Sequence, residues 1–531
     1  MTTASLSSAP SASQSAAPDV ANNAGIAMFA SVFYMATRLL LPPLALAHLS
    51  LAEYGLWSVC FILIMYIGLA DVGFSNVYVR FVAQFHAAGD TAAINRLLST
   101  GVLTLAAISL LLIAGLSLAL PQVLDFLKVD SAQRGAAQVL VLGAVAMFLL
   151  DMTLGAYCYV LHGLQRIREE KRVAIVGFVL EPLLILLFFQ LGLGVYSLLL
   201  AFVLRYLWSL LAFARLAHRF LPGLRLRPAL YDRTMLKHFF GFGAAVQCSA
   251  LLGTVLFSID RVLAGFLLGP QGVALFELGS KLPVSAIAIP ANISNVIYPA
   301  GARHAAQNAQ AAIRALHAQA SRATGLVASL PLAFMVLFAA PLSQAWLGER
   351  AELAALPSIL ALSALAAHLH IITGPGSALF RAMGQVANEF VYHGLRIATL
   401  ALACGLLVLL DAVDVAGLAF ALSGSGLLAA LLYLLHNQRR LGLPLGALLR
   451  DILLPAALAY PLAALSLGLG ESLVPATASR WQLLSMLLGC GLFYTLAWAS
   501  CLWPLLRRDE RAWISLRLSP LTARLPRWRK T

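Results

Sequence analysis

The chain has 531 residues, of which 61% are hydrophobic and only 11% are charged, and its mean hydropathy is +0.87. Soluble domains are nearer half apolar and a quarter charged, so this composition excludes an ordinary soluble protein. Uncharged stretches such as 101–120 are long enough to cross a hydrocarbon core about 30 Å thick, whereas a β-barrel would show short alternating segments. We therefore expect an all-α polytopic membrane protein.

The hydropathy pattern predicts fourteen transmembrane helices after an N-terminal tail. Residues 1–19 are rich in Ser, Ala and Pro and lack the basic and apolar regions of a signal peptide, so we expect this tail to be disordered. The expected helices are 24–47, 54–79, 97–120, 136–161, 173–193, 195–214, 238–264, 272–300, 323–342, 353–380, 386–410, 415–436, 452–470 and 481–506.

The distribution of basic residues predicts the orientation. If the N-terminus is cytoplasmic, the even-numbered connections and the tail hold 26 of the 36 Lys and Arg residues. The loops on the other side hold only Lys128, Arg134, Arg350 and Arg480. Because basic loops stay inside, both termini are predicted to be cytoplasmic. The basic segment 507–531 is expected to rest on anionic lipid head groups, and the net charge of +14 does not require a nucleic-acid partner.

The chain contains an internal repeat. Residues 73–97 reappear in outline at 292–316, where nine of 25 positions are identical without a gap, including the Ser-Asn-Val run at 75–77 and 294–296. A duplicated half is typical of transporters in which two similar bundles move about a central site. Because six helices separate the copies, both start on the same membrane side, which predicts parallel repeats.

The repeat predicts two six-helix lobes and a C-terminal helix pair, a count that distinguishes the chain from simple twelve-helix carriers. The expected divisions are the tail (1–19), the N-lobe (20–220), a cytoplasmic linker (221–237), the C-lobe (238–440), helices 13 and 14 (441–506) and a basic cytoplasmic tail (507–531). The run Gly374-Pro375-Gly376 lies inside a predicted helix. Such a run indicates either a break that lines a cavity or a local packing kink.

No motif predicts an enzyme or a metal protein. The six cysteines are scattered through apolar stretches without a metal-binding spacing, so they are expected to be packing residues. The sequence has no Walker loop, no H-E-x-x-H and no serine nucleophile motif. We expect no catalytic residues, no metal and no cofactor, and no ATP-driven mechanism within the chain.

Several short motifs follow one another in a distinctive order. They are Tyr54-Gly55-Leu56-Trp57, Asp71-x-Gly73, Val79-Arg80-Phe81-Val82, Gly89-Asp90 and Asp260-Arg261. With these motifs, segments 51–90 and 258–282 resemble Wzx-type oligosaccharide flippases of the multidrug/oligosaccharidyl-lipid/polysaccharide (MOP) superfamily. The resemblance covers roughly 30–320 and implies a glycan linked to polyprenyl pyrophosphate as the substrate. It implies movement of this lipid from the cytoplasmic to the periplasmic leaflet of a bacterial inner membrane by alternating access.

Charged residues within the spans are the candidate site residues. Each is costly to insert, at roughly 2.5–3.5 kcal/mol, and usually faces a cavity. Because a pyrophosphate is anionic, the cations Arg38, Arg261 and Lys281 are predicted to line the cavity. Arg80 is a further candidate, although it could instead extend to the cytoplasmic edge of the membrane. An ion pair of Arg38 within the first lobe remains an alternative.

The acidic candidates are Asp71, Asp260 and Glu277, which could be counter-charges or sites for H⁺ or Na⁺ coupling. Asp260 could neutralise the adjacent Arg261, and Glu277 lies four residues before Lys281, where a direct pair forms readily on a helix. The sequence alone does not assign partners to the other charges inside spans: Asp151, Glu181, Arg205 and Arg396.

Three classes of function compete. A lipid-linked glycan flippase accounts for the fourteen helices and the arginines. A multidrug/cation antiporter of the same superfamily would usually have twelve helices, and a glycan polymerase or ligase would carry a large periplasmic loop. A peptidoglycan-precursor flippase is a close relative within the first class, and polymerase or export machinery could be a partner.

Overall fold

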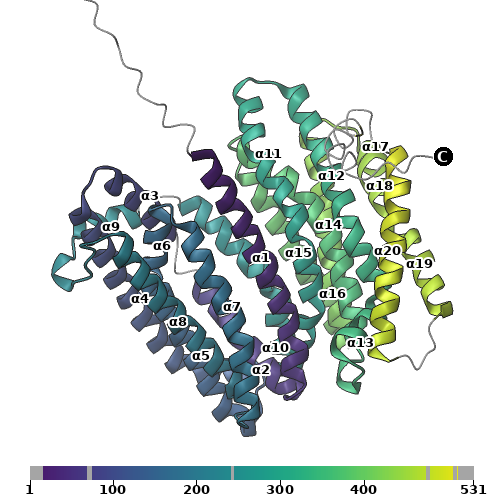
Figure 1. Cartoon of the computed structure of the whole chain (residues 1–531). Helices are drawn as coiled ribbons and strands as arrows, with labels where there is room; N and C mark the ends of the chain where they lie inside the picture. The colour runs from purple at the N-terminus through teal and green to yellow at the C-terminus, as the bar shows by residue number, and fades with distance from the viewer. Residues whose placement is uncertain (1–15, 69–73, 241–243, 474–478, 506–510, 512–531) are drawn as a thin grey trace, which may run out of the picture. The chain divides into compact units, whose positions relative to one another are not determined.

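The computed structural model describes residues 16–68, 74–240, 244–473, 479–505 and 511 (Figure 1). This part of the chain is helical and contains no strand. Within it, twelve helices are long and apolar enough to cross a membrane. The all-α membrane class is therefore confirmed, whereas the count of fourteen spans stays a prediction.

The chain divides into two compact units, 1–274 and 275–531. The helices that lie wholly in the first unit are α1 (Ala16–Leu46), α2 (Leu51–Ile67), α3 (Phe74–Ala87), α4 (Thr91–Phe126), α5 (Arg134–Leu154), α6 (Ala156–Gly163), α7 (Ile167–Gln190), α8 (Tyr196–Phe220) and α9 (Arg233–Phe240), with 3₁₀ turns at Ser131–Gln133 and Pro228–Leu230. Helix α10 (Ala244–Ala286) passes from the first unit into the second and is interrupted by a turn at Gly269, whose φ of +73° and ψ of −167° are not helical. Helices α4, α5, α7 and α8 run side by side (Figure 1).

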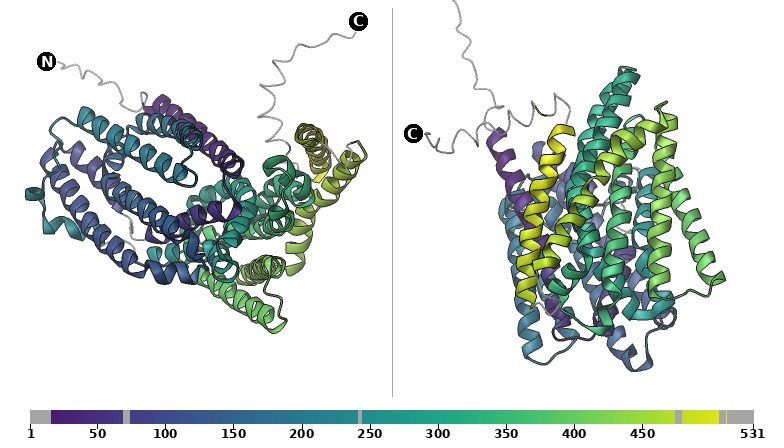
Figure 2. Two further views of the ribbon diagram at one scale, coloured as in Figure 1. Left: turned by 90° about the horizontal axis from the view of Figure 1, so that it is seen from below. Right: turned by 90° about the vertical axis from the view of Figure 1, so that its right-hand side faces the viewer.

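The second unit holds the remaining helices. They are α11 (Ala288–Ala306), α12 (Gln310–Leu337), α13 (Ala339–Leu347), α14 (Leu356–Ala382), α15 (Ala387–Leu409), α16 (Val415–Arg440), α17 (Leu445–Ala447), α18 (Leu454–Ala457), α19 (Ala459–Leu473) and α20 (Arg480–Leu505), with a 3₁₀ turn at Ala351–Leu353 and a π-helical turn at Leu448–Leu453. The final pair, α19 and α20, lie against each other (Figure 2).

Several of the predicted spans are divided among more than one described element; 136–161 is shared by α5 and α6, and 323–342 by α12 and α13. The predicted span 54–79 includes residues 69–73, which lie outside the described residues, between α2 and α3. The predicted span 272–300 is divided between α10 and α11. At the N-terminus, α1 begins at Ala16, so the last four residues of the predicted disordered tail are helical. Pro18 is compatible with this because the first turn of a helix needs no N–H from it.

The internal repeat relates five pairs of helices in one register, the register that aligns position 73 with position 292. In this register the end of α3 at Ala87 corresponds to the end of α11 at Ala306. It also relates the starts of α4 and α12 at Thr91 and Gln310, the ends of α6 and α14 at Gly163 and Ala382, the ends of α7 and α15 at Gln190 and Leu409, and the starts of α8 and α16 at Tyr196 and Val415. The duplication that is visible in the sequence as one short match therefore shapes both halves.

The turns of the two halves follow the same register. Gly89 has φ +72° and its counterpart Asn308 has φ +52°, while Gln165 has φ +59° and its counterpart Gly384 has φ +75°. Glycine and asparagine are the residues that enter this left-handed region most readily. The left-handed backbone conformation is thus the same at equivalent positions of the two halves, although the residue type differs.

Residues in and beside two of the motifs that suggested the family cap helices or allow close packing. The Ser50 side chain caps α2 by accepting from Glu53 N, and the Glu53 carboxylate accepts from Ser50 N in return. Asp90 caps α4 by accepting a 2.8 Å hydrogen bond from Ala93 N. A Cβ on Gly55 would lie 2.0 Å from the carbonyl oxygen of Pro270, so only glycine fits against this turn.

The run Gly374-Pro375-Gly376 does not break its helix, because α14 continues through it. A Cβ on Gly374 would lie 2.8 Å from Ser294 Oγ, and one on Gly376 would lie 2.5 Å from Asn437 Nδ2. Both glycines let neighbouring helices approach closely, which favours the packing interpretation of this run.

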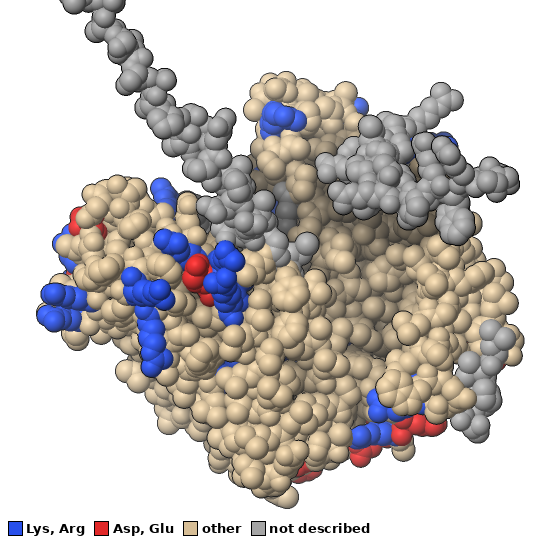
Figure 3. Space-filling view, viewed as in Figure 1, with Lys and Arg blue, Asp and Glu red and all other residues tan. Residues whose placement is uncertain are grey.

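The outer surface of unit 1 suits a lipid environment. Leu110, Leu111 and Leu118 of α4 are 69–80% exposed. Figure 3 shows Lys and Arg side chains gathered at the end of this unit where α3 and α9 lie, above a broad uncharged surface. Such an arrangement is typical of a bundle whose apolar side faces lipid and whose basic end faces the head groups.

Candidate functional site

Three charged side chains meet inside unit 1. Arg38 of α1 donates two hydrogen bonds to the carboxylate of Glu181 on α7, Nη1 to Oε1 at 3.2 Å and Nη2 to Oε2 at 3.0 Å. Arg205 of α8 brings its Nε to 3.3 Å from the same Oε2. Two guanidinium groups therefore share one carboxylate across three helices.

The carboxylate is the most enclosed member of this triad. The Glu181 side chain is 6% exposed and that of Arg205 is 10% exposed, whereas 21% of the Arg38 side chain remains accessible. Aromatic rings cover the cations: the Arg38 guanidinium lies 5.1 Å from the ring centre of Tyr34, and that of Arg205 lies 4.0 Å from that of Tyr206. A cation over an aromatic face is stabilised by the electrons of the ring.

A fourth group, Asp151 of α5, lies close enough to Arg205 to interact with it electrostatically. Two cations and two carboxyl groups thus gather at the junction of α1, α5, α7 and α8. Charges removed from water must be compensated, which explains why these groups occur together. A guanidinium donates two parallel hydrogen bonds to a phosphate in the same geometry as it does to a carboxylate. Arg38 could therefore exchange Glu181 for an anionic ligand.

The other predicted cations have different surroundings. Arg80 of α3 is exposed, and its guanidinium lies 5.3 Å from the ring centre of the adjacent Phe81, as expected of a side chain that extends to the membrane edge. Lys281 Nζ donates a 2.9 Å hydrogen bond to Glu277 Oε1, so the predicted pair on one helical face forms. Asp260 and Arg261 are half-buried in α10.

The predicted site residues do not form one cluster within either unit. Arg38, Arg80 and the Asp260-Arg261 pair lie in the first unit, whereas Glu277 and Lys281 lie in the second. Asp71 lies outside the described residues. The contact that the sequence did not assign is the triad, in which Glu181 and Arg205 complete the surroundings of Arg38.

The triad has no counterpart in the second half. In the register of the internal repeat, Arg38, Glu181 and Arg205 correspond to Phe257, Leu400 and Gly424. The second half instead carries an arginine on the other helix of the corresponding pair: Arg396 of α15 occupies the position of Gly177 in α7. Each half therefore places an arginine between these two helices, but on opposite sides of the contact.

A buried hydrogen-bond network accompanies Arg396 in the second unit. Arg396 Nη1 donates to Ser425 Oγ at 2.8 Å and to the carbonyl oxygen of Leu422 at 3.1 Å. Nearby on the same helices, Asn388 Nδ2 donates to Tyr433 OH and to Asn437 Oδ1, both at 3.1 Å. Sequence reasoning missed this network because neutral polar residues in an apolar helix give no charge signal.

Comparisons with known proteins identify the fold. An inward closed structure of the lipid II flippase MurJ covers 91% of this chain and 98% of its own, with 13% identity and a TM-score of 0.66. An inward-facing multidrug resistance MATE transporter of the MOP superfamily covers 78% of this chain and 94% of its own, with 15% identity and a TM-score of 0.58. A MOP-superfamily transporter from Pyrococcus furiosus covers 80% and 95%, with 16% identity and a TM-score of 0.55.

A match to a family model identifies the family, whereas no curated protein sequence matches the chain. A family model described as polysaccharide biosynthesis protein matches residues 46–352, which is more than half of the chain and includes all the motifs noted above. This match confirms the resemblance to Wzx-type polysaccharide flippases. With its MOP-superfamily fold, the chain belongs to the polysaccharide biosynthesis protein family.

Proposed function

We propose that this protein flips an oligosaccharide carried on polyprenyl pyrophosphate from the cytoplasmic to the periplasmic leaflet by alternating access. The family concerns polysaccharide biosynthesis, and the solved neighbours are transporters and flippases, not enzymes. Neither the hydroxyls of a glycan nor the charge of a pyrophosphate crosses hydrocarbon unaided. A protein that turns a polar cavity from one side to the other removes this cost.

The observation that carries the proposal is the shared carboxylate of the triad. Arg38 holds Glu181 with both ends of its guanidinium, yet keeps a fifth of its side chain accessible. A pyrophosphate presents oxygen pairs that fit the same guanidinium face. When Arg38 binds the ligand, Arg205 still neutralises the charge of Glu181, so the buried carboxylate keeps one cationic partner.

The test separates a role in binding from a role in structure. In a strain lacking the endogenous flippase, Arg38→Gln should abolish surface polysaccharide and leave the lipid-linked glycan in the cytoplasmic leaflet. Arg38→Gln/Glu181→Gln removes this ion pair as a unit and leaves Arg205 with Asp151 as its neighbouring carboxyl group. If Arg38 serves only the ion pair, this double variant restores export. We expect it to remain inactive at a normal protein level in the membrane.

The matched control is a surface ion pair of the second unit. Arg450 Nε lies 2.9 Å from Asp451 Oδ1, and their side chains are 80% and 34% exposed. Arg450→Gln/Asp451→Asn should leave export intact, because exposed pairs contribute little. Normal export by Arg38→Gln alone would refute the role of this arginine.

The other charged residues predicted from the sequence would act along the same path. Arg80, Arg261 and Lys281 would supply further positive charge, Asp71, Asp260 and Glu277 would be counter-charges, and H⁺ or Na⁺ would be the coupling ion. We place the protein in a bacterial inner membrane with both termini in the cytoplasm. Its basic tail, of which only Arg511 is among the described residues, would rest on anionic lipids. Polymerase or export machinery would take up the product.

A peptidoglycan-precursor flippase is the second candidate. The MurJ structure covers 91% of this chain and the MATE transporter 78%, as expected if helices beyond a twelve-helix core are shared with the former. Complementation of a strain that lacks its peptidoglycan-precursor flippase distinguishes the two substrates. Growth of that strain on this gene would favour the second candidate, and restored surface polysaccharide without such growth would favour the first.

A further inference from the structure

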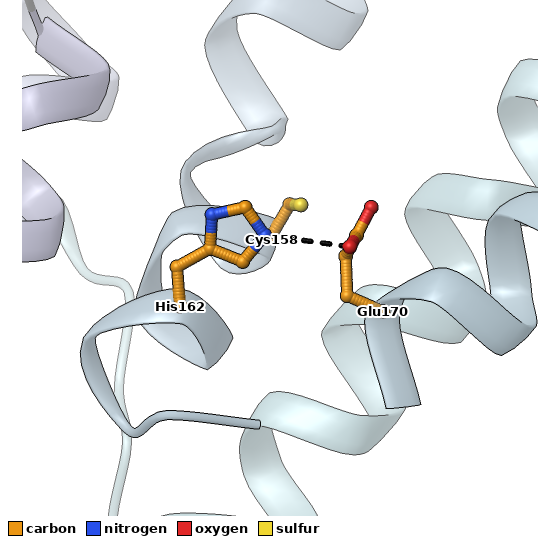
Figure 4. A group of neighbouring side chains, drawn as sticks. All are labelled: Cys158, His162 and Glu170. Atoms are coloured by element: carbon orange, nitrogen blue, oxygen red, sulfur yellow. Dashed lines mark ion pairs between the residues drawn. The ribbon is translucent and has the colours of Figure 1, made fainter. Parts of the chain in front are cut away.

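Three side chains with metal-binding atoms meet where α6 joins α7. Cys158 and His162 lie one turn apart on α6, and Glu170 lies in the first turn of α7 (Figure 4). The thiol sulphur, a ring nitrogen and a carboxylate oxygen all lie within 4.8 Å of one another. The group is separate from the Arg38 triad and takes no part in the proposed binding of pyrophosphate.

The spacing suits a tetrahedral metal ion. Zinc bonds of about 2.3 Å to sulphur and about 2.0–2.2 Å to nitrogen and oxygen place neighbouring ligand atoms about 3.3–3.6 Å apart. His162 Nε2 already lies 3.5 Å from Glu170 Oε2. The sulphur of Cys158 would need to move by about 1 Å, which rotation of its side chain provides.

The two ligand atoms on the facing side chains are enclosed without a hydrogen bond of good geometry. Among the described residues, His162 Nε2 and Glu170 Oε2 are buried atoms that form a 3.5 Å ion pair with each other but no hydrogen bond that meets the usual geometric criteria. Lys171 Nζ forms an ion pair with this oxygen at 3.1 Å. A buried polar atom without a hydrogen bond usually marks a functional role or an absent ion or water.

The second half of the chain shows what the same position looks like as a simple ion pair. In the register of the internal repeat, Cys158, His162 and Glu170 correspond to Ser377, Arg381 and Glu389. There Arg381 Nε lies 3.0 Å from Glu389 Oε1 and links the two corresponding helices. The first half keeps the carboxylate but has a thiol and an imidazole in place of the hydroxyl and the guanidinium. Neither hydroxyl nor guanidinium is a common zinc ligand, whereas thiolate and imidazole both are.

We propose that Cys158, His162 and Glu170 bind a zinc ion that links α6 to α7 at the basic end of unit 1. Sulphur, nitrogen and oxygen together suit Zn²⁺, whereas Mg²⁺ and Ca²⁺ prefer oxygen alone. On binding, the thiol gives its proton to water, Lys171 leaves the carboxylate, and a water molecule completes the tetrahedron. The ion does in the first half what the Arg381–Glu389 pair does in the second.

The test is zinc binding by the full-length protein, purified without a histidine tag in detergent. After removal of metals and incubation with zinc, we expect about one zinc ion per chain by mass spectrometry. Cobalt in place of zinc should give a thiolate-to-cobalt charge-transfer band. Cys158→Ser should remove both signals. Lys171→Met should tighten zinc binding, because it frees the carboxylate.

Two controls keep the result decisive. Cys404→Ser changes another half-buried cysteine, and Glu169→Gln changes the neighbouring carboxylate; both should bind zinc as the wild type does. Cys158→Ser/His162→Arg recreates the ion pair of the second half, so it should fold and export glycan normally but bind no zinc. Wild-type protein without bound zinc, or equal zinc loss in the two controls, would overturn the proposal.

Discussion

Replacement of Gly376 by alanine tests whether the Gly-Pro-Gly run of α14 is a packing site. The added Cβ would lie 2.5 Å from Asn437 Nδ2 and 3.3 Å from its Cγ, where ordinary contacts are 3.4 Å or longer. Asn437 is fully buried, so it must turn away or α14 and α16 must separate by about 1 Å. Turning away breaks the bond in which Asn388 Nδ2 donates to Asn437 Oδ1.

The expected cost follows from these two effects. Overpacking of a tight core costs about 1–3 kcal/mol, and loss of the buried hydrogen bond adds about 1 kcal/mol. Alanine gains about 1 kcal/mol over glycine in a helix interior, which offsets part of this loss. We expect Gly376→Ala to destabilise the protein by about 1–3 kcal/mol.

The measurement is the temperature at which the detergent-solubilised protein loses its monodisperse elution peak. Gly405→Ala on α15 is the matched control, because nothing lies within 4 Å of its added Cβ and only the helix preference changes. Asn437→Ala in the Gly376→Ala background removes the clash, so the two substitutions should be less than additive. Equal stability of Gly376→Ala and Gly405→Ala would refute the packing interpretation.

Three further predictions concern other parts of the molecule. Gly55→Ala should cost at least about 3 kcal/mol, seen as a lower melting temperature, because its Cβ would meet the rigid carbonyl of Pro270 at 2.0 Å. Tyr460→Phe should cost about 1–3 kcal/mol in the same assay by removing a 2.8 Å bond to a buried histidine of α14; wild-type stability would contradict this. Hydrogen bonds from Thr234 lower the pKa of Asp232. The stabilisation from this carboxylate is therefore present above the ordinary aspartate pKa of about 4 and is lost as the pH falls through the lower pKa of the folded protein. Asp232→Asn should reduce the melting temperature at neutral pH but not in acid, and a difference independent of pH would argue against this role.

The family motifs illustrate how far sequence alone could reach. Their order predicted the family, and the structure shows that residues of two of these motifs allow close packing or cap a helix. Gly55 faces the Pro270 carbonyl, and Asp90 caps α4. Such residues are informative about family because each fixes a backbone position that few other residue types satisfy.

The sequence by itself determined the membrane class, the duplication and the family, because each depends on composition or on order along the chain. The tertiary structure decided the partners of the charges. Glu181 is far from Arg38 along the chain, and three separate helices must pack before Arg38 and Arg205 can share it. The meeting of Cys158 with Glu170 likewise depends on how α6 turns into α7. Charge pairing and metal binding depend on distances of a few ångström, which helix packing sets.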